Sequence, residues 1–152
     1  MCDKMATVKY IETGSPKGSL NMLRLFICER DSKQRKHMET LVSDHIALHN
    51  YDMTIALSAD NLAPILDYLN AYAIERGLYI LDVNTESILI ASKIKRYDPH
   101  GKIVFVSACP EALHLIFKHR IEALDYIIKD SPENLTTEIK KCVDVAYERL
   151  RL

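Results

Sequence analysis

The sequence lacks the features that would place it in or across a membrane. No run of about 18 apolar residues occurs in the 152-residue chain. The first residues also lack the apolar block of a signal peptide. These absences exclude a membrane-spanning helix and an export signal, so we expect a cytoplasmic protein with no membrane partner.

Cysteine pairs and a strong net charge are also missing. The four cysteines lie far apart at Cys2, Cys28, Cys109 and Cys142, and none is spaced as a zinc ligand pair. We therefore expect reduced thiols and no zinc framework. The formal charge is −1 and the basic residues are scattered, so nothing across the chain as a whole indicates a nucleic-acid partner.

Enzyme motifs are equally scarce. Only four glycines occur and no glycine-rich loop opens a helix, so a nucleotide-binding or flavin-binding enzyme has no supporting motif. His45 and His49 are four residues apart, but they fall at a predicted helix end, where we expect solvent exposure rather than metal binding. The chain is therefore predicted not to be an enzyme.

From Leu23 onward, short apolar runs alternate with helical patterns. The runs are "LRLFICE", "YDMTIAL", "LYILD", "KIVFVS" and "ALDYIIKD". Helices are predicted after each run, with Asp60 as the cap of the second, Gly77 at its end, and a continuous third helix over 87–97. Ser131 and Pro132 predict the start of the last helix.

This alternation predicts an α/β fold, a doubly wound five-stranded parallel sheet with helices on both faces. We assign it to residues 22–152. Residues 1–21, whose second half is rich in Gly, Ser, Pro and Lys, are expected to be a flexible leader or tag, or an upstream extension. In such sheets the functional groups gather at the carboxyl ends of the strands. The polar residues at those ends are Glu29, Arg30, Asp31, Asp82, Ser107 and Lys129.

An ordered set of these residues resembles the receiver domain of bacterial response regulators. An acid follows the first strand, Asp82 ends the third, Ser107 the fourth and Lys129 the fifth. The segments "LFICERDSKQR", "ILDV", "YDPHGKIVFVS" and "ALDYIIKD" are similar to AgrA-type regulators of the LytTR family, which act in peptide quorum sensing. The resemblance implies the flavodoxin-like, CheY-like (βα)5 fold with strand order 2-1-3-4-5.

The resemblance also implies a role for each residue. Asp82 would accept a phosphoryl group from a sensor histidine kinase, Lys129 would pair with that group, and Ser107 would hydrogen-bond it. Tyr126 occupies the aromatic switch position. Mg²⁺ would be held by Glu29, by Asp82 and by the backbone carbonyl of Asn84. Each residue also has an ordinary structural reading, with Asp82 as a helix cap and Tyr126 as a core aromatic.

Two departures from the family pattern leave an alternative open. Arg30 stands where receivers usually carry a second acid, and an arginine cannot bind Mg²⁺. Asp31 could replace that acid, although "DSKQ" also reads as a capping box with Asp31 as N-cap and Gln34 at its third position. The loop "VNTES" is shorter than usual. Arg30 could therefore neutralise Asp82 in a pseudo-receiver that acts as a phosphorylation-independent protein-interaction module.

The resemblance implies partners as well. We expect a sensor histidine kinase and a second copy of the chain. The homodimer would form on the face made by the predicted helix that begins at Pro110, the strand "ALDYIIKD" and the last helix. AgrA-type regulators carry a LytTR DNA-binding domain, and the last predicted helix leaves no room for it in this chain. DNA binding is thus expected only through a domain absent from these residues, in transcription regulation by a longer protein.

Overall fold

The computed structural model describes residues 22–85 and 87–151. A five-stranded sheet in the order β2-β1-β3-β4-β5 forms its centre, and every neighbouring pair is parallel. The strands are β1 (Leu23–Cys28), β2 (Met53–Ala59), β3 (Leu78–Asp82), β4 (Lys102–Ser107) and β5 (Asp125–Ile128). The predicted doubly wound sheet and its strand order are confirmed. The expected leader at residues 1–21 lies outside the described residues.

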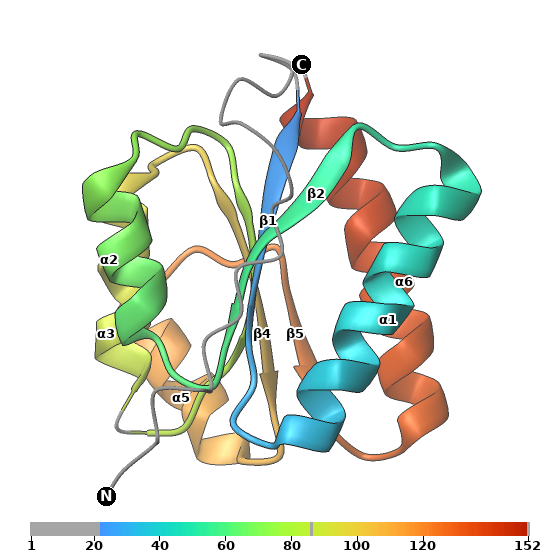
Figure 1. Ribbon diagram of the computed structural model, residues 1–152. Helices are drawn as coiled ribbons and strands as arrows, with labels where there is room; N and C mark the ends of the chain where they lie inside the picture. The colour runs from blue at the N-terminus through green and yellow to red at the C-terminus, as the bar shows by residue number, and fades with distance from the viewer. Residues whose placement is uncertain (1–21, 86, 152) are drawn as a thin grey trace, which may run out of the picture.

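Helices cover both faces of the sheet. Figure 1 shows α1 (Ser32–His49) and α6 (Pro132–Leu150) side by side on one face. The other face carries α2 (Ala63–Ala71), α3 (Ile88–Ser92), α4 (Ile94–Tyr97) and α5 (Pro110–Lys118). Alternate residues of β1, β3 and β4 enter two separate apolar cores, and this burial on both sides accounts for the apolar strands.

Two helix starts follow the local sequence closely. The side chain of Asp31 accepts hydrogen bonds from the backbone N–H groups of Lys33 and Gln34, at 2.8 and 3.1 Å, and so caps α1. Ser131 caps α6 by accepting from Asn134 N–H at 3.1 Å. Both caps satisfy donors that the first helical turn leaves without a partner.

Three local predictions around the second and third helices were wrong. Asn61, not Asp60, accepts a hydrogen bond from the first turn of α2, through Ala63 N–H at 2.9 Å. Helix α2 ends at Ala71, well before Gly77. The expected helix over 87–97 is split into α3 and α4 at Lys93.

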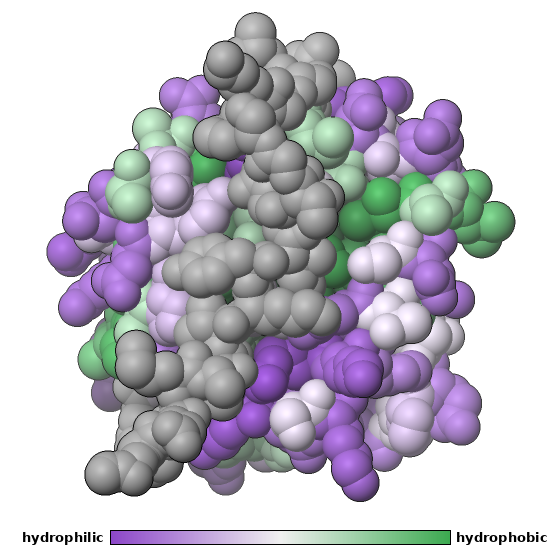
Figure 2. All heavy atoms as spheres, in the orientation of Figure 1, coloured by the Kyte–Doolittle hydropathy of each residue, from purple (hydrophilic) through white to green (hydrophobic). Residues whose placement is uncertain are grey.

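The parallel strands bring their carboxyl ends to one edge of the sheet, together with the N-termini of α1 and α6. This is the lower edge in Figure 1, and Figure 2 shows hydrophilic residues gathered over the same part of the visible surface. The opposite edge carries the C-terminal ends of α1 and α6. No helix among the described residues is long and apolar enough to cross a membrane.

Candidate functional site

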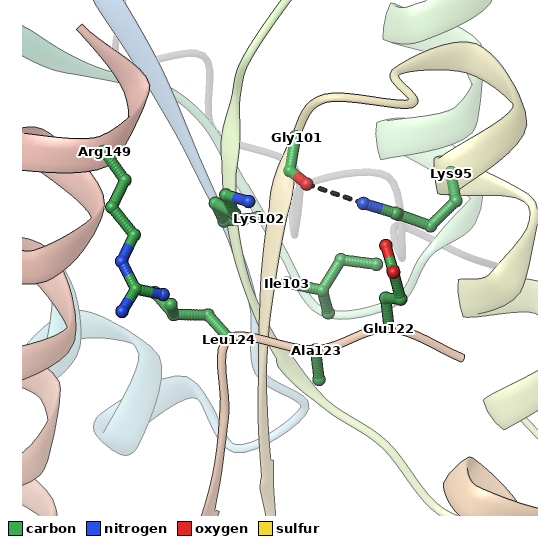
Figure 3. Close-up of a pocket in the computed structure, with 8 residues that line it drawn as sticks. All are labelled: Lys95, Gly101, Lys102, Ile103, Glu122, Ala123, Leu124 and Arg149. Atoms are coloured by element: carbon green, nitrogen blue, oxygen red, sulfur yellow. Dashed lines mark hydrogen bonds between the residues drawn. The ribbon is translucent and has the colours of Figure 1, made fainter. Parts of the chain in front are cut away.

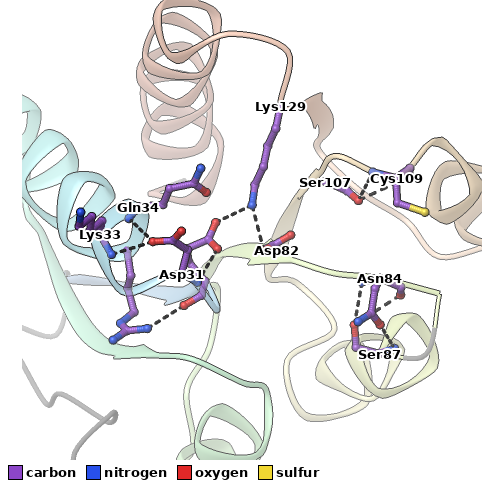
Figure 4. A network of polar contacts seen from close by, with 11 residues as sticks. Asp31, Lys33, Gln34, Asp82, Asn84, Ser87, Ser107, Cys109 and Lys129 are labelled. Carbon is purple, nitrogen blue, oxygen red and sulfur yellow. Dashed lines mark hydrogen bonds and ion pairs between the residues drawn. The ribbon is translucent and has the colours of Figure 1, made fainter.

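Lys129 is the centre of the polar cluster at the carboxyl edge of the sheet. Its Nζ lies 2.8 Å from Glu29 Oε1 and 3.0 Å from Asp82 Oδ2, so one ammonium group bridges the acids that follow β1 and end β3 (Figure 4). The Lys129 backbone N–H also donates to the carbonyl of Ser107 at 3.0 Å. Residues at the carboxyl ends of four strands therefore contact one another through Lys129.

Burial differs sharply between the two acids. The Glu29 side chain is 1% exposed, whereas that of Asp82 is 21% exposed. Burial raises the pKa of Glu29, and the hydrogen bonds from Lys129 and from the Asp31 N–H oppose that rise. The pKa of Lys129 is also raised, because hydrogen bonds to both acids outweigh its own burial. Glu29 thus anchors the lysine, and Asp82 is the acid that faces outward.

A hollow of about 300 Å³ opens beside Asp82. Asn84, Ser107, Lys129 and Arg30 line it, with three further residues of the loops after β3 and β4. The sequence placed Arg30, Asp82, Ser107 and Lys129 at strand ends, and the structure brings them around one space. The Lys129 ammonium and the Ser107 hydroxyl can donate hydrogen bonds into this space. They are therefore suited to binding the oxygens of a small anionic group beside Asp82.

Ser107 and Tyr126 both contact the same peptide segment. Ser107 Oγ accepts a hydrogen bond from the Cys109 N–H at 2.9 Å, and the Tyr126 hydroxyl donates to the Cys109 carbonyl at 2.9 Å. Ser107 is buried and Tyr126 is half-buried. The loop after β4 therefore connects the serine of the hollow mechanically to the tyrosine of β5, a link that the sequence alone did not reveal.

The short loop after β3 is closed by two reciprocal hydrogen bonds. Asn84 N–H donates to Ser87 Oγ at 3.0 Å, and Ser87 N–H donates to Asn84 Oδ1 at 2.9 Å. This pairing turns the chain directly from Asp82 into α3. The side-chain amide of Asn84 thus shapes the loop, and its backbone carbonyl remains the group predicted to bind metal.

Neither Arg30 nor Asp31 places a second acid beside Glu29 at the hollow. Arg30 is exposed at the rim of the hollow, and among the residues that the structure describes it forms no ion pair with Asp82. Asp31 caps α1, and its backbone N–H donates to Glu29 Oε2 at 3.0 Å. The cap reading of Asp31 is confirmed. Of the acids predicted to bind Mg²⁺ at this edge, only Asp82 lines the hollow, whereas Glu29 is buried and pairs with Lys129.

A second hollow of about 270 Å³ lies at the opposite edge of the sheet (Figure 3). Lys95 and Arg149 are among its lining residues, and Glu122 lies opposite Lys95. The Lys95 ammonium already donates to the carbonyls of Pro99 and Gly101, at 3.1 and 2.8 Å. The lysine therefore ties down the turn before β4, and none of the predicted site residues lies here.

Comparison with known proteins relates this geometry to a family. No family model matches the chain. The accessory gene regulator protein A of Staphylococcus aureus (strain N315) is 36% identical over 134 residues, which cover 86% of this chain and 56% of that protein. The protein of the same name from Staphylococcus epidermidis is 33% identical over the same share. The chain thus spans little more than half the length of these curated relatives.

Solved structures supply the architectural match. The response regulatory domain of protein mrkE from Klebsiella pneumoniae superposes with a TM-score of 0.65 at 25% identity, covering 83% of this chain and 98% of that one. This chain is a response regulator receiver domain of the AgrA type. A LuxR-family response regulator from Staphylococcus aureus, 16% identical, shares the fold with a TM-score of 0.64 over 82% of this chain and 98% of that one.

The receiver domain also holds a polar cluster that sequence reasoning missed. His45, expected to be exposed, is 7% exposed and lies 2.7 Å from Asp144 of α6. His49 is exposed as expected. The partner residue is 99 positions away along the chain, so no local spacing could have pointed to it.

Proposed function

We propose that this receiver domain accepts a phosphoryl group on Asp82 and is a signalling switch rather than an enzyme with a separate substrate. The observation that supports this most directly is the Lys129 bridge. Its ammonium lies 3.0 Å from the outward-facing Asp82 and is anchored by buried Glu29. A fixed cation beside an accessible carboxylate stabilises the charge that a phosphoryl group adds.

The proposed reaction is a displacement at phosphorus. A carboxylate oxygen of Asp82 attacks the phosphorus of a phosphohistidine in a sensor kinase. The new P–O bond forms as the P–N bond breaks, and the electron pair returns to the imidazole, which takes up a proton. Lys129 contacts the phosphoryl oxygens from the side of β5, and Ser107 donates a hydrogen bond from the side of β4.

The contacts around Cys109 suggest how phosphorylation would change the surface. The Ser107 hydroxyl now faces the Cys109 carbonyl, 3.5 Å from Oγ, and to donate to a phosphoryl oxygen it must turn away from that carbonyl toward Asp82. The loop after β4 then shifts, and the Tyr126 hydroxyl loses its acceptor on the same residue. Tyr126 would reorient as a consequence, which favours one of two arrangements of the face formed by α5 and β5.

Oxygen ligands for Mg²⁺ are present, although they are fewer than two adjacent acids would provide. Glu29, Asp82 and the carbonyl of Asn84 would hold the ion, and these are the oxygen donors that Mg²⁺ prefers. When bound, Mg²⁺ would offset the negative charge of the phosphoryl oxygens. Glu29 currently accepts from both Lys129 and the Asp31 N–H. We therefore propose a Mg²⁺ site of low affinity.

The partners follow from the family and remain proposals. A sensor histidine kinase would supply the phosphoryl group, and a homodimer would form on the α5 and β5 face. Phe117 and Ile128 on that face are 72% and 47% exposed. DNA binding would belong to a longer protein of the AgrA type in the cytoplasm. The pseudo-receiver alternative is not favoured, because Asp82 pairs with Lys129 and not with Arg30.

Mass spectrometry of the intact chain tests the phosphoacceptor. Incubation with acetyl phosphate and Mg²⁺ is expected to add the mass of one phosphoryl group to the wild type and none to Asp82→Asn. Asp60→Asn is the matched control, because Asp60 follows β2 and lines a hollow that Asp82 also borders. A wild type without the adduct, or an adduct that survives in Asp82→Asn, contradicts the proposal.

Substituting Arg30 tests the metal site. Arg30→Asp places an acid at the rim of the hollow, so we expect the dissociation constant for Mg²⁺ to fall at least about tenfold, or about 1.4 kcal/mol. Isothermal titration calorimetry measures it. Lys33→Asp makes the same change of charge on the exposed first turn of α1. An equal gain in both variants would mean that overall charge, and not coordination, sets the affinity.

A further inference from the structure

A second chemically distinct cluster joins α1 to α6 at the edge of the sheet opposite Asp82. His45 and His49 lie one turn apart near the C-terminal end of α1, and Asp144 faces them from α6. One ligand atom from each of the three residues lies within 4.8 Å of the others. Two imidazoles and a carboxylate therefore converge on one point between two helices.

The positions of these groups are fixed by their neighbours. Asp144 Oδ1 lies 2.7 Å from His45 Nε2 and accepts a hydrogen bond from the Tyr51 hydroxyl at 2.8 Å. The Tyr51 ring stacks on His49 and on Tyr147, with centroid distances of 5.3 and 4.1 Å. A hydrogen bond that orients a carboxylate is the kind of support that surrounds metal ligands in proteins.

Burial and charge also suit a cation at this point. The His45 side chain is 6% exposed, whereas that of Asp144 is 45% exposed, so the cluster has a buried base and an open side. Burial alone would raise the pKa of Asp144, but the hydrogen bonds from His45 and Tyr51 hold that pKa below its ordinary value. Asp144 is therefore available as a carboxylate at neutral pH.

We propose that His45, His49 and Asp144 form a binding site for a divalent transition metal of the zinc class. Two histidines and one carboxylate are a frequent ligand set for Zn²⁺, with water in the fourth position. Mg²⁺ and Ca²⁺ prefer oxygen ligands and would bind poorly. The metal replaces the proton shared by His45 and Asp144, whose ligand atoms move apart by a few tenths of an ångström to admit it.

Bound metal would clamp the C-terminal end of α1 to α6. Tyr51 and Tyr147 already stack between these elements, so the metal would strengthen an existing contact rather than create a new one. A ligand that binds only the folded state raises its stability. The site lies at the far edge from Asp82, so this proposal stands or falls independently of phosphorylation.

Zinc titration of the tag-free chain tests the site. The wild type is expected to bind one Zn²⁺ ion by isothermal titration calorimetry, and its melting temperature is expected to rise with added Zn²⁺. Excess Mg²⁺ should displace none of it. Replacing Zn²⁺ by Co²⁺ should give the visible absorption bands of a four-coordinate ion with nitrogen and oxygen ligands.

His49→Gln is the decisive variant, because the His49 side chain is exposed and its loss should leave the fold intact. We expect at least a tenfold weaker affinity for Zn²⁺ in this variant and in Asp144→Asn. His37→Gln removes an exposed histidine from the first half of the same helix and should bind as the wild type does. Absence of binding by the wild type, or affinity unchanged in His49→Gln, would overturn the proposal.

Discussion

Replacing Lys129 by methionine is expected to lower the free energy of unfolding by about 3 kcal/mol or more. Its ammonium is the shared partner of Glu29 and Asp82, at 2.8 and 3.0 Å. Methionine keeps most of the aliphatic volume but leaves the Glu29 carboxylate, 1% exposed, without its cation. A buried charge without its counterion costs several kcal/mol unless it takes up a proton.

Urea unfolding monitored by circular dichroism measures this loss. Lys141→Met is the matched control, because Lys141 is 67% exposed and lies 3.5 Å from Glu138 on the surface of α6. Such exposed pairs contribute about 0.5 kcal/mol or less. The double variant Glu29→Gln/Lys129→Met should recover much of the lost stability. A loss as small as that of Lys141→Met would show that the bridge does not stabilise the edge.

The sheet was predictable because its signals are local and repeated. The strands β1 to β4 are apolar runs buried on both faces. Four of the helices, α1, α2, α5 and α6, begin with a cap or a proline, as at Asp31 and Ser131. The position of the site followed from topology, since parallel strands place Glu29, Asp82 and Lys129 at one edge. The strand order alone could not predict the distances between these side chains.

The segment after Asp82 could not be predicted in detail, because short-range hydrogen bonds there compete with a regular helix. Ser92 Oγ donates to the Leu89 carbonyl at 2.6 Å, and the Lys93 N–H bonds three residues back, to Ile90. These contacts tighten the chain and divide the expected helix into α3 and α4. The spacing of apolar residues is the same whether this segment forms one helix or two, so it could not predict the break.

The histidine cluster shows a different limit. His45 was expected in solvent because it occurs near a helix end, yet α6 covers that end and supplies Asp144. The packing of two helices that are distant in sequence decides this burial. The link from Ser107 through Cys109 to Tyr126 is likewise set by how β5 lies against the loop after β4.

Asp98→Ala is expected to destabilise the receiver domain by at least about 3 kcal/mol, as measured by urea unfolding. Asp98 is 1% exposed and accepts hydrogen bonds from the N–H groups of Arg76 and Gly77 and from the Tyr79 hydroxyl, at 2.9, 2.7 and 2.8 Å. Alanine leaves three donors without this acceptor. Asp67→Ala, on the exposed side of α2, should change stability by about 0.5 kcal/mol or less.

Tyr79→Phe removes only the hydrogen bond from the Tyr79 hydroxyl, and the stability lost through this substitution is expected to depend on pH. The variant keeps both backbone bonds to Asp98, so we expect a loss of about 1 to 3 kcal/mol at pH 7. Burial beside Asp98 raises the pKa of Tyr79 well above its usual range. The unfolded tyrosine ionises near pH 10 while the folded one keeps its proton, so the wild type loses stability above about pH 10. The Phe variant has no such loss. The difference in free energy of unfolding between the two proteins should therefore decrease from pH 9 to pH 11. A constant difference would mean that Tyr79 ionises equally in the folded and unfolded states.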